Sequence, residues 1–272
     1  MIDAHCHLQS ARFEAPIEAV VASARTSGVE AIILAGVEPE GWQRQAELAA
    51  QFPDVWPVLG IHPWVAATLD DAGLDRMMAA LERALENTPR VVAIGESGLD
   101  GYTDAHKVAL DRQEASMRRH LGLAARTGLP IVLHSVKAHA PILRVLKDAG
   151  IPDAGGVVHS FSGSAELARA YVALGLHVSF SGTLTFGRSR RLQEAAIAVP
   201  DDRLLIETDA PDQTPEPHRG TPNQPANLPL VASALAELRG STPAHIASVT
   251  SANARRLFGL PASTAPGSSF AG

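Results

Sequence analysis

Short apolar runs alternate with longer amphipathic stretches along almost the whole chain, and this alternation limits the possible folds more than any other feature. Eight runs have the length and composition of strands: 2–8, 30–37, 55–62, 91–99, 129–135, 155–161, 177–182 and 203–210. Helical patterns lie between them, over 15–27, 40–51, 74–87, 111–127, 139–149, 164–174 and 188–198. Several runs are apolar on both faces, as parallel strands covered by helices are. The pattern predicts an α/β protein with a single (β/α)8 TIM barrel.

The length of the chain agrees with one such barrel, because 272 residues is close to the usual size of this fold. We expect the barrel to occupy residues 1–261 and the small polar residues 262–272 to form a flexible C-terminal tail. One cysteine, Cys6, excludes an intrachain disulfide. The sequence has neither a pattern typical of a secretory signal nor an apolar stretch of the roughly 18 residues that a membrane span needs. We therefore expect a cytoplasmic monomer without membrane contact.

The charge of the chain limits its partners. Its 23 Lys and Arg against 29 Asp and Glu give a net charge of −6, which argues against a broad basic surface for duplex DNA. Aromatic residues make up only 4% of the chain, so a broad surface for stacking bases is not expected either. Any binding of phosphate must depend on local groups or on metal ions.

Ionisable side chains gather at the ends of the predicted strands. These residues are His5, His7, His62, Glu96, His134, His159 and Asp209. In a parallel barrel the carboxyl ends of the strands meet at the face where ligands bind, so we expect these side chains to lie together. His5 and His7 are two residues apart in a strand, so their imidazoles point to the same side and Cys6 points to the other.

Six of these residues supply the nitrogen and oxygen donors that divalent metal ions prefer. They are His5, His7, Glu96, His134, His159 and Asp209. Six mixed donors suit two ions (Zn²⁺, Mn²⁺ or Mg²⁺) better than one structural zinc, and Glu96 can bridge two ions. Each residue also has a structural interpretation, such as a hydrogen-bonded core histidine or a helix cap at Asp209. Their concentration at one predicted face favours the metal centre.

Several motifs, in this order, resemble the TatD-like metal-dependent hydrolases, a deoxyribonuclease family of the amidohydrolase-type barrel superfamily. They are IDAHCHL, GIHP, AIGESGLD, LPIVLHS, HSFSGS, ETDAP, PHRGTPNQPA and SANARRLFGL. The resemblance covers residues 2–260 and implies a (β/α)8 barrel with a hydrolytic metal centre at its mouth.

The resemblance also divides the six ligands between two ions, with Glu96 between them. It implies that one ion is held by His5, His7 and Asp209, and the other by His134 and His159. His62 matches the GxHP position and is expected to face substrate or to support the ligands; the alternative is a structural histidine before Pro63.

Four positions depart from the family pattern. Trp64 stands where many relatives have a histidine, and residues 134–137 (HSVK) lack an arginine. Asp212 follows ETDAP where an aromatic residue is common, and the loop 219–225 lacks two basic residues. All four lie outside the expected ligand set. They weaken the case for DNA as the substrate more than the case for the metals.

The mechanism that we expect is metal-assisted hydrolysis, with Glu96 and Asp209 as the catalytic residues. Water held between two ions is acidified, and Asp209 carries its proton to the leaving group. Basic residues for binding substrate phosphate are expected at Arg188, Arg190 and Arg219. Cations at the start of a helix oppose its dipole, so a phosphate chain could compensate them; the alternative is a solvated patch paired with Glu194.

Three functions remain open from the sequence. The first is a nuclease that removes nucleotides from the ends of single-stranded DNA. The second is a hydrolase of a small phosphoester, ester, lactone or amide on the same metal centre. The third is a metal-bound barrel without catalytic activity that acts as a binding protein, and the complete ligand set argues against it.

Overall fold

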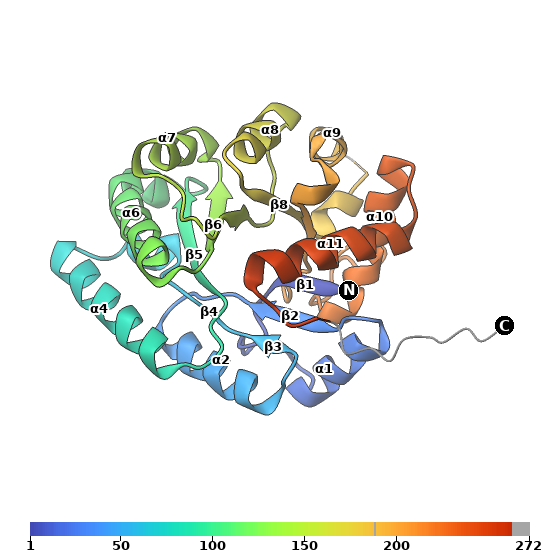
Figure 1. Cartoon of the computed structure of the whole chain (residues 1–272), viewed down its shortest axis with the longest axis horizontal. Helices are drawn as coiled ribbons and strands as arrows, with labels where there is room; N and C mark the ends of the chain where they lie inside the picture. Colours follow the sequence, from blue (N-terminus) through green and yellow to red (C-terminus); the bar gives the residue numbers. More distant parts are fainter. Residues whose placement is uncertain (188, 263–272) are drawn as a thin grey trace.

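The strands form the inner wall of a barrel, and the helices surround it (Figure 1). The structure is a computed structural model that describes residues 1–187 and 189–262. The strands are β1 (Ile2–Cys6), β2 (Ala31–Leu34), β3 (Val55–Trp56), β4 (Val58–Leu59), β5 (Ala93–Asp100), β6 (Ile131–Val136), β7 (Gly156–Val158), β8 (His177–Phe180) and β9 (Leu204–Ile206). The third predicted strand is divided into β3 and β4 at Pro57, because proline cannot donate a hydrogen bond to a neighbouring strand.

Neighbouring strands are parallel, in two hydrogen-bonded sets with the orders β1-β2-β3 and β4-β5-β6-β7-β8-β9. Backbone bonds also join the last strand position to the first. The Asp209 N–H donates to the His5 carbonyl at 3.0 Å, and the His7 N–H donates to the Ala210 carbonyl at 2.8 Å. These bonds bring the ends of β1 and β9 together, and the architecture is the predicted (β/α)8 barrel.

The outer layer consists of helices that mostly follow the predicted ranges. They are α1 (Ile17–Thr26), α2 (Pro39–Gln51), α4 (Asp71–Asn87), α6 (Leu110–Thr127), α7 (His139–Ala149), α8 (Ala165–Ala173) and α9 (Arg190–Ala198). Four further helices were not predicted: α3 (Pro63–Ala66), α5 (Asp104–Val108), α10 (Leu228–Arg239) and α11 (Pro243–Phe258). The first two are too short to show a helical period. The other two follow the last strand, where no further strand marks their limits.

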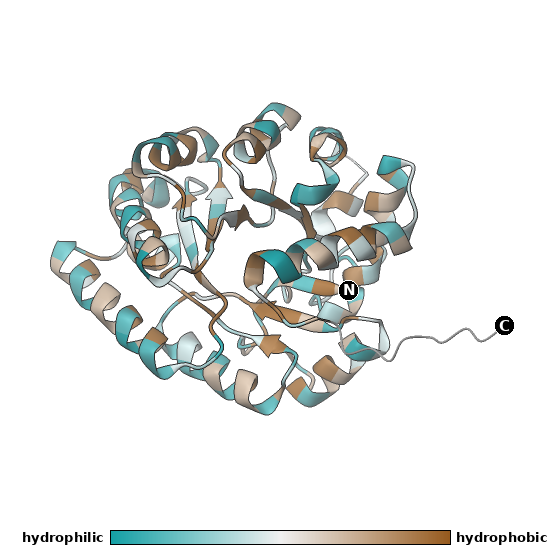
Figure 2. Ribbon diagram, in the orientation of Figure 1, coloured by the Kyte–Doolittle hydropathy of each residue, from teal (hydrophilic) through white to brown (hydrophobic). Residues whose placement is uncertain are grey.

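Apolar side chains fill the space between the strands and the outer helices, and Figure 2 shows the strands and the inner faces of the helices as hydrophobic. A second apolar cluster lies at the amino-terminal ends of the strands. There Ala254, Leu257 and Phe258 of α11 pack in one cluster with residues such as Ile2 and Val92. In Figure 1, α11 lies across the strands. Because α11 covers this end, ligands must enter at the carboxyl ends of the strands.

Two other expectations concern membrane spans and the C-terminal tail, and the structure informs them only for the residues that it describes. None of the described helices is long and apolar enough to span a membrane. Of the predicted tail 262–272, only Ala262 is described, and it is exposed. The remaining positions of the tail lie outside the described residues.

His177 begins β8 and gives the fold an acid-sensitive position. Its side chain is buried, and neither ring nitrogen has a hydrogen-bond partner of suitable geometry among the described residues. Burial, assisted by the charge of Arg203, lowers the pKa of His177 from 6.5 to about 4. The unfolded chain therefore binds this proton at a higher pH than the folded chain does. Folding loses stability from this residue as the pH falls from about 6.5 to about 4.

Replacing His177 with leucine is expected to remove this acid dependence. The free energy of unfolding of the wild type should fall by up to about 3 kcal/mol more than that of His177→Leu over the same pH range. Urea unfolding of both proteins between pH 7 and pH 4 measures the difference. Val108→Leu provides a control, because it changes an exposed side chain that does not titrate and should keep the wild-type dependence. Parallel pH profiles for wild type and His177→Leu would show that His177 does not resist protonation.

Candidate metal centre

A cavity of about 670 Å³ opens at the carboxyl ends of the strands. Its lining includes six of the seven strand-end residues that the sequence singled out: His7, His62, Glu96, His134, His159 and Asp209. His5 is the seventh and is buried beside them, with Nε2 3.2 Å from Glu96 Oε2. The structure therefore brings all seven side chains together.

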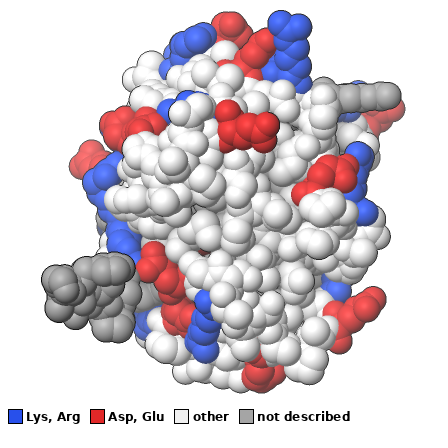
Figure 3. Space-filling view, turned by 90° about the vertical axis from the view of Figure 1, so that its right-hand side faces the viewer, with Lys and Arg blue, Asp and Glu red and all other residues white. Residues whose placement is uncertain are grey.

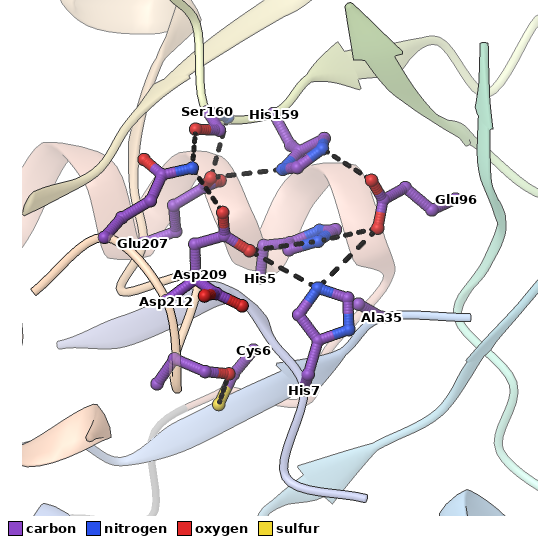
Figure 4. Close-up of polar contacts among 12 residues, drawn as sticks. His5, Cys6, His7, Ala35, Glu96, His159, Ser160, Glu207, Asp209 and Asp212 are labelled. Carbon is purple, nitrogen blue, oxygen red and sulfur yellow. Dashed lines mark hydrogen bonds and ion pairs between the residues drawn. The ribbon is translucent and has the colours of Figure 1, made fainter. Parts of the chain in front are cut away.

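Glu96 lies at the centre of this cluster, and its two oxygens face different histidines. Oε1 is 2.7 Å from His134 Nδ1 and 2.8 Å from His159 Nε2. Oε2 is 3.2 Å from His5 Nε2 and 3.7 Å from His7 Nε2, and Figure 4 shows both histidines directed toward it. Burial alone would raise the pKa of Glu96, but the surrounding imidazoles, His159 first, hold it well below its usual value. The carboxylate is therefore negatively charged at neutral pH.

Two glycines allow β5 to present Glu96 in this way. Gly95 and Gly98 have φ angles of 141° and 147°, a region that side chains disfavour. A Cβ on Gly98 would lie 2.1 Å from the carbonyl oxygen of His134 in β6. The register between the two strands shifts in the segment from Ile94 to Ser97, and such an irregularity redirects a side chain. Glycine at both positions thus permits the close approach of β5 and β6 around Glu96.

Asp209 lies on the His5–His7 side of the cluster. Its Oδ1 is 3.3 Å from His7 Nε2 and 3.8 Å from His5 Nε2. The side-chain amide of Gln213 donates to its Oδ2. Burial alone would raise the pKa of Asp209, but the bond to His7 and the nearby imidazoles hold it below its usual value. Asp209, Gln213 and Ser160 all have positive φ angles, a conformation that costs energy in residues other than glycine and is frequent at functional sites.

Two further carboxylates determine which ring nitrogens of His134 and His159 face the cluster. Asp100 Oδ2 is 3.1 Å from His134 Nε2, and Glu207 Oε1 is 3.3 Å from His159 Nδ1. When His134 Nε2 and His159 Nδ1 carry the protons, His134 Nδ1 and His159 Nε2 carry lone pairs. These two unprotonated nitrogens lie 3.3 Å apart. Histidines that bind metals have this arrangement, with the second nitrogen donating to a carboxylate. Two lone pairs at this distance repel unless a cation or a proton lies between them.

The pKa of His159 agrees with a demand for positive charge at this point. Burial alone would lower the pKa, but Glu96 and Glu207 raise it well above its usual value. Sequence analysis did not assign Asp100 and Glu207 this orienting role. Asp100 ends the apolar run AIGESGLD in the same way as the other strand-end residues end theirs, so the signal was present.

His62 differs from the other histidines because of the atom that its Nδ1 contacts. It is the N-cap residue of α3, and Nδ1 accepts the N–H of Trp64 at 3.1 Å. The ring proton therefore lies on Nε2, which is 3.2 Å from Glu96 Oε1. Burial lowers the pKa of His62 to about 4, so the ring is neutral at pH 7. A protonated nitrogen cannot bind a metal, and this geometry favours His62 as a hydrogen-bond donor to Glu96.

The cluster fits divalent metal ions. Three overlapping groups of side chains have one ligand atom each within 4.8 Å of one another: His5–His159–Asp209, His5–His7–Glu96 and His62–Glu96–His134. His5 Nε2 and Glu96 Oε2 are buried 3.2 Å apart, and among the described residues neither atom makes a hydrogen bond of suitable geometry. Unpaired buried polar atoms are costly, and a shared cation would satisfy both. Imidazole and carboxylate donors suit zinc and manganese, so the described residues fit the expected centre.

Cys6 lies outside this cluster, as the alternation along β1 predicts. Its side chain is fully buried in the apolar core, and Sγ lies 3.7 Å from the Ala210 carbonyl oxygen (Figure 4). Burial raises the pKa of the thiol well above its usual value. Because its side chain lies in the apolar core and outside the groups of possible ligands, Cys6 is a core residue and not a candidate donor.

Replacing Cys6 with serine is therefore expected to leave the metal content of the protein unchanged. Elemental analysis of folded wild-type and Cys6→Ser protein, reconstituted under the same conditions, measures the ratio of metal to protein. A folded Cys6→Ser protein without metal would show that the thiol contributes to the site.

Two of the three expected phosphate-binding arginines, Arg190 and Arg219, do not line the cavity. Arg190 belongs to the basic run 188–191 (RSRR). Its side chain is almost fully exposed and pairs with Glu194 at 3.0 Å, which agrees with the alternative of a solvated patch. Arg219 lies over the Phe186 ring at 4.3 Å and is also outside the cavity lining. Arg188 lies outside the described residues.

Two other arginines lie closer to the cavity, and sequence analysis missed both. Arg12 lines the cavity and forms a double hydrogen bond with Asp212, at 2.6 and 2.9 Å. Arg191 lines an adjacent hollow of about 390 Å³, which shares Ser160 and Gln213 with the main cavity. No motif marks Arg12. Arg191 belongs to the basic run, but the sequence could not show which of its arginines turns toward the site.

Comparisons with known proteins agree with this geometry. Residues 2–259 match the family described as TatD related DNase. The chain belongs to this family. It is 38% identical over 265 residues to an uncharacterized metal-dependent hydrolase TatD of Mycobacterium tuberculosis, covering 96% of this chain and 98% of the relative. It is 35% identical over 265 residues to a 3′-5′ ssDNA/RNA exonuclease TatD of Cronobacter sakazakii, covering 95% and 97%.

The crystal structure of the TatD homologue YjjV from Escherichia coli has the same fold. It aligns with a TM-score of 0.87 and 35% identity, over 96% of this chain and 98% of that chain. Within the TatD family pattern, the structure explains two of the departures in this sequence. Asp212 pairs with Arg12, and the Trp64 indole donates to Asp100 at 2.7 Å. Both departures lie at the rim of the cavity and outside the cluster around Glu96.

Proposed function

We propose that this chain is a divalent-metal-dependent hydrolase that removes nucleotides from the ends of single-stranded nucleic acid. The observation that carries the proposal is Glu96, a buried carboxylate with one oxygen toward His5 and His7 and the other toward His134 and His159. A carboxylate in this position could serve as a ligand shared by two ions. The exonuclease name of the Cronobacter relative supports the choice of substrate.

The proposed ligands fall into the two sets that the family resemblance implies. His5, His7 and Asp209 would hold one ion, His134 and His159 the other, and Glu96 both. Divalent ions bound there would acidify a coordinated water toward neutral pH and polarise the phosphoryl oxygen. Asp100 and Glu207 would keep the ligating nitrogens of His134 and His159 free of protons.

Asp209 would accept a proton from the attacking water and return it to the leaving oxygen. Its carboxylate is ionised, and Gln213 occupies Oδ2, so Oδ1 is the oxygen turned toward the cluster. His62 would keep its Nε2 proton as a donor, because Nδ1 already accepts from the chain. Asp209 would therefore accept a proton, whereas His62 would donate a hydrogen bond.

A small phosphoester or ester is a second candidate substrate, and the pairing of the cations favours it. Arg12 is bonded to Asp212, Arg190 to Glu194, and Arg219 lies 3.7 Å from Glu216. The side of the barrel drawn in Figure 3, which is the right-hand side of Figure 1, also shows acidic and basic side chains interspersed. A long polyanion would have to displace these partners, whereas a small substrate need not.

A cleavage assay tests the proposal and separates the two substrates. Protein reconstituted with Mn²⁺, Mg²⁺ or Zn²⁺ is incubated with single-stranded DNA labelled at its 5′ end, and separately with p-nitrophenyl phosphodiesters and carboxylic esters. We expect stepwise shortening of the DNA from its 3′ end. Turnover of the small esters alone would replace the nuclease by the second candidate. Absence of turnover on every substrate at full metal occupancy would contradict both.

Arg191 and Arg190 provide a matched pair for locating the phosphate contacts. Arg191→Ala is expected to weaken binding of single-stranded DNA and to reduce the salt dependence of that binding by about one unit in slope, because one phosphate contact is lost. Arg190→Ala should change neither, since its guanidinium is paired with Glu194. Fluorescence anisotropy at several salt concentrations measures both quantities. Equal losses in the two variants would indicate a diffuse effect of charge.

A further inference from the structure

Two exposed aromatic side chains line the mouth of the cavity. Among the described residues, four large apolar side chains are exposed: Trp64, Tyr102, Val108 and Ile197. Trp64 is 53% exposed and Tyr102 64%, and both line the cavity that contains Glu96. They come from different loops, because Trp64 lies in α3 after β4 and Tyr102 follows β5. Large aromatic groups exposed at a concave surface mark a site of contact with a ligand.

One carboxylate positions both residues. Asp100 Oδ2 accepts the indole N–H of Trp64 at 2.7 Å, and Asp100 Oδ1 accepts the backbone N–H of Tyr102 at 2.7 Å. The same Oδ2 is 3.1 Å from His134 Nε2. The ring centres of Trp64 and His134 are 6.4 Å apart. The indole is thus held at a fixed place beside a proposed metal ligand before any ligand arrives.

Cationic and polar groups surround these rings. Lys137 Nζ lies 4.5 Å from the centre of the Tyr102 ring. His106 covers part of Trp64 in an offset stack, with the ring centres 6.0 Å apart and the planes at 24°. Lys137 lies over the Tyr102 ring, so this wall of the cavity offers a nucleotide both aromatic rings for its base and a cation for its phosphate. An uncharged aliphatic ligand would gain nothing from the lysine.

We propose that Trp64 and Tyr102 form a stacking site for one nucleobase of the substrate and determine its preference for nucleotides over small esters. The inference rests on the proposed function, because it assumes a nucleic acid as the substrate. The low aromatic content of the chain excludes a broad stacking surface, yet two rings are enough for one base. A base held against Trp64 lies next to His134, so its phosphate is directed toward the cluster around Glu96.

Binding of two small probes tests the site without any cleavage. The probes are 2′-deoxyadenosine 5′-monophosphate and 2-deoxyribose 5-phosphate, which differ only in the base. Isothermal titration of the metal-loaded protein should show tighter binding of the nucleotide by about 5- to 150-fold, the range that stacking of one base provides. Trp64→Ala and Tyr102→Ala should each reduce this ratio, and the double variant should bring it close to one. Affinity for the sugar phosphate should remain at the wild-type value.

Three controls keep the result specific. Tyr102→Ala keeps the backbone N–H that bonds to Asp100, so a change in that variant comes from the ring. Trp64→Phe keeps a ring without the bond to Asp100 and should retain most of the preference for the nucleotide. Ile197→Ala removes an equally exposed apolar side chain that does not line the cavity, and should behave as the wild type.

Two outcomes would overturn the stacking site. One is equal affinity of the wild type for the two probes, or binding of neither. The other is a preference for the nucleotide that survives in the double variant. Either result can occur while the protein still cleaves DNA, and the expected result can be obtained even if cleavage fails. Failure of the stacking site and failure of the proposed function are therefore distinguishable.

Discussion

Replacing Glu96 with glutamine is expected to remove bound metal and to abolish turnover together. Among the described residues, Glu96 is the one carboxylate that contacts histidines on both sides of the cluster, and its charge is maintained by the imidazoles around it. Glutamine keeps the size of the side chain but offers one neutral oxygen. Metal affinity should fall by more than the roughly 10–100-fold that is typical when an outer-shell partner is lost. Titration with Zn²⁺ or Mn²⁺, followed by elemental analysis, measures this loss.

Glu207 provides the matched control for this prediction. It is also a buried glutamate, but within the described part of the chain its hydrogen bonds are to His159 Nδ1 and the Ser160 N–H. Glu207→Gln should therefore weaken metal binding by about 10–100-fold, because it leaves all of the proposed metal ligands in place. The decisive result is that metal affinity falls further in Glu96→Gln than in Glu207→Gln. Wild-type metal content in Glu96→Gln, or a larger loss in Glu207→Gln, would remove Glu96 from the centre of the site.

Most of the fold could be predicted because the barrel repeats one local pattern. Each strand is a short apolar run that is buried on both faces, and each following helix has its own period, so eight strand positions were visible in the sequence. The division at Pro57 and the short helix α3 were not, since both depend on single prolines inside or beside a strand. α11 was missed for another reason. Its apolar residues pack against the end of the barrel, and no sequence neighbour indicates that contact.

The candidate site could be predicted as far as strand ends determine it. His5, Glu96, His134 and the other strand-end residues lie together because parallel strands bring their carboxyl ends to one face. Loop residues followed no such rule. Gln213 reaches Asp209 from a loop with a positive φ angle, and Arg12 reaches Asp212 across 200 residues of sequence. Arg190 at the start of α9 and Arg219 in a loop show the converse, since each turns toward a local partner instead.

Replacing Asp209 with asparagine is expected to slow the chemical step while metal and substrate still bind. Asparagine keeps the shape of the side chain and an oxygen near His7, but it cannot accept the proton of the attacking water. Single-turnover rates on any accepted substrate should fall by roughly 10²–10⁴-fold, the usual size of a general acid–base contribution. Metal occupancy is measured in the same samples, so that loss of an ion is not mistaken for loss of the base.

Asp212 offers the control, because it lies three residues further along the same loop and bonds to Arg12 instead of the cluster. Asp212→Asn should leave the single-turnover rate near the wild-type value, whereas Asp209→Asn should not. Gln213→Leu then tests how Asp209 is held: freeing Oδ2 should lower the rate less than removing the carboxylate does, because the base is still present. A wild-type rate for Asp209→Asn at full occupancy would mean that another group takes the proton. His62 could not replace it without first giving up the N–H of Trp64 or its own proton, so such a result would require a different mechanism for this site.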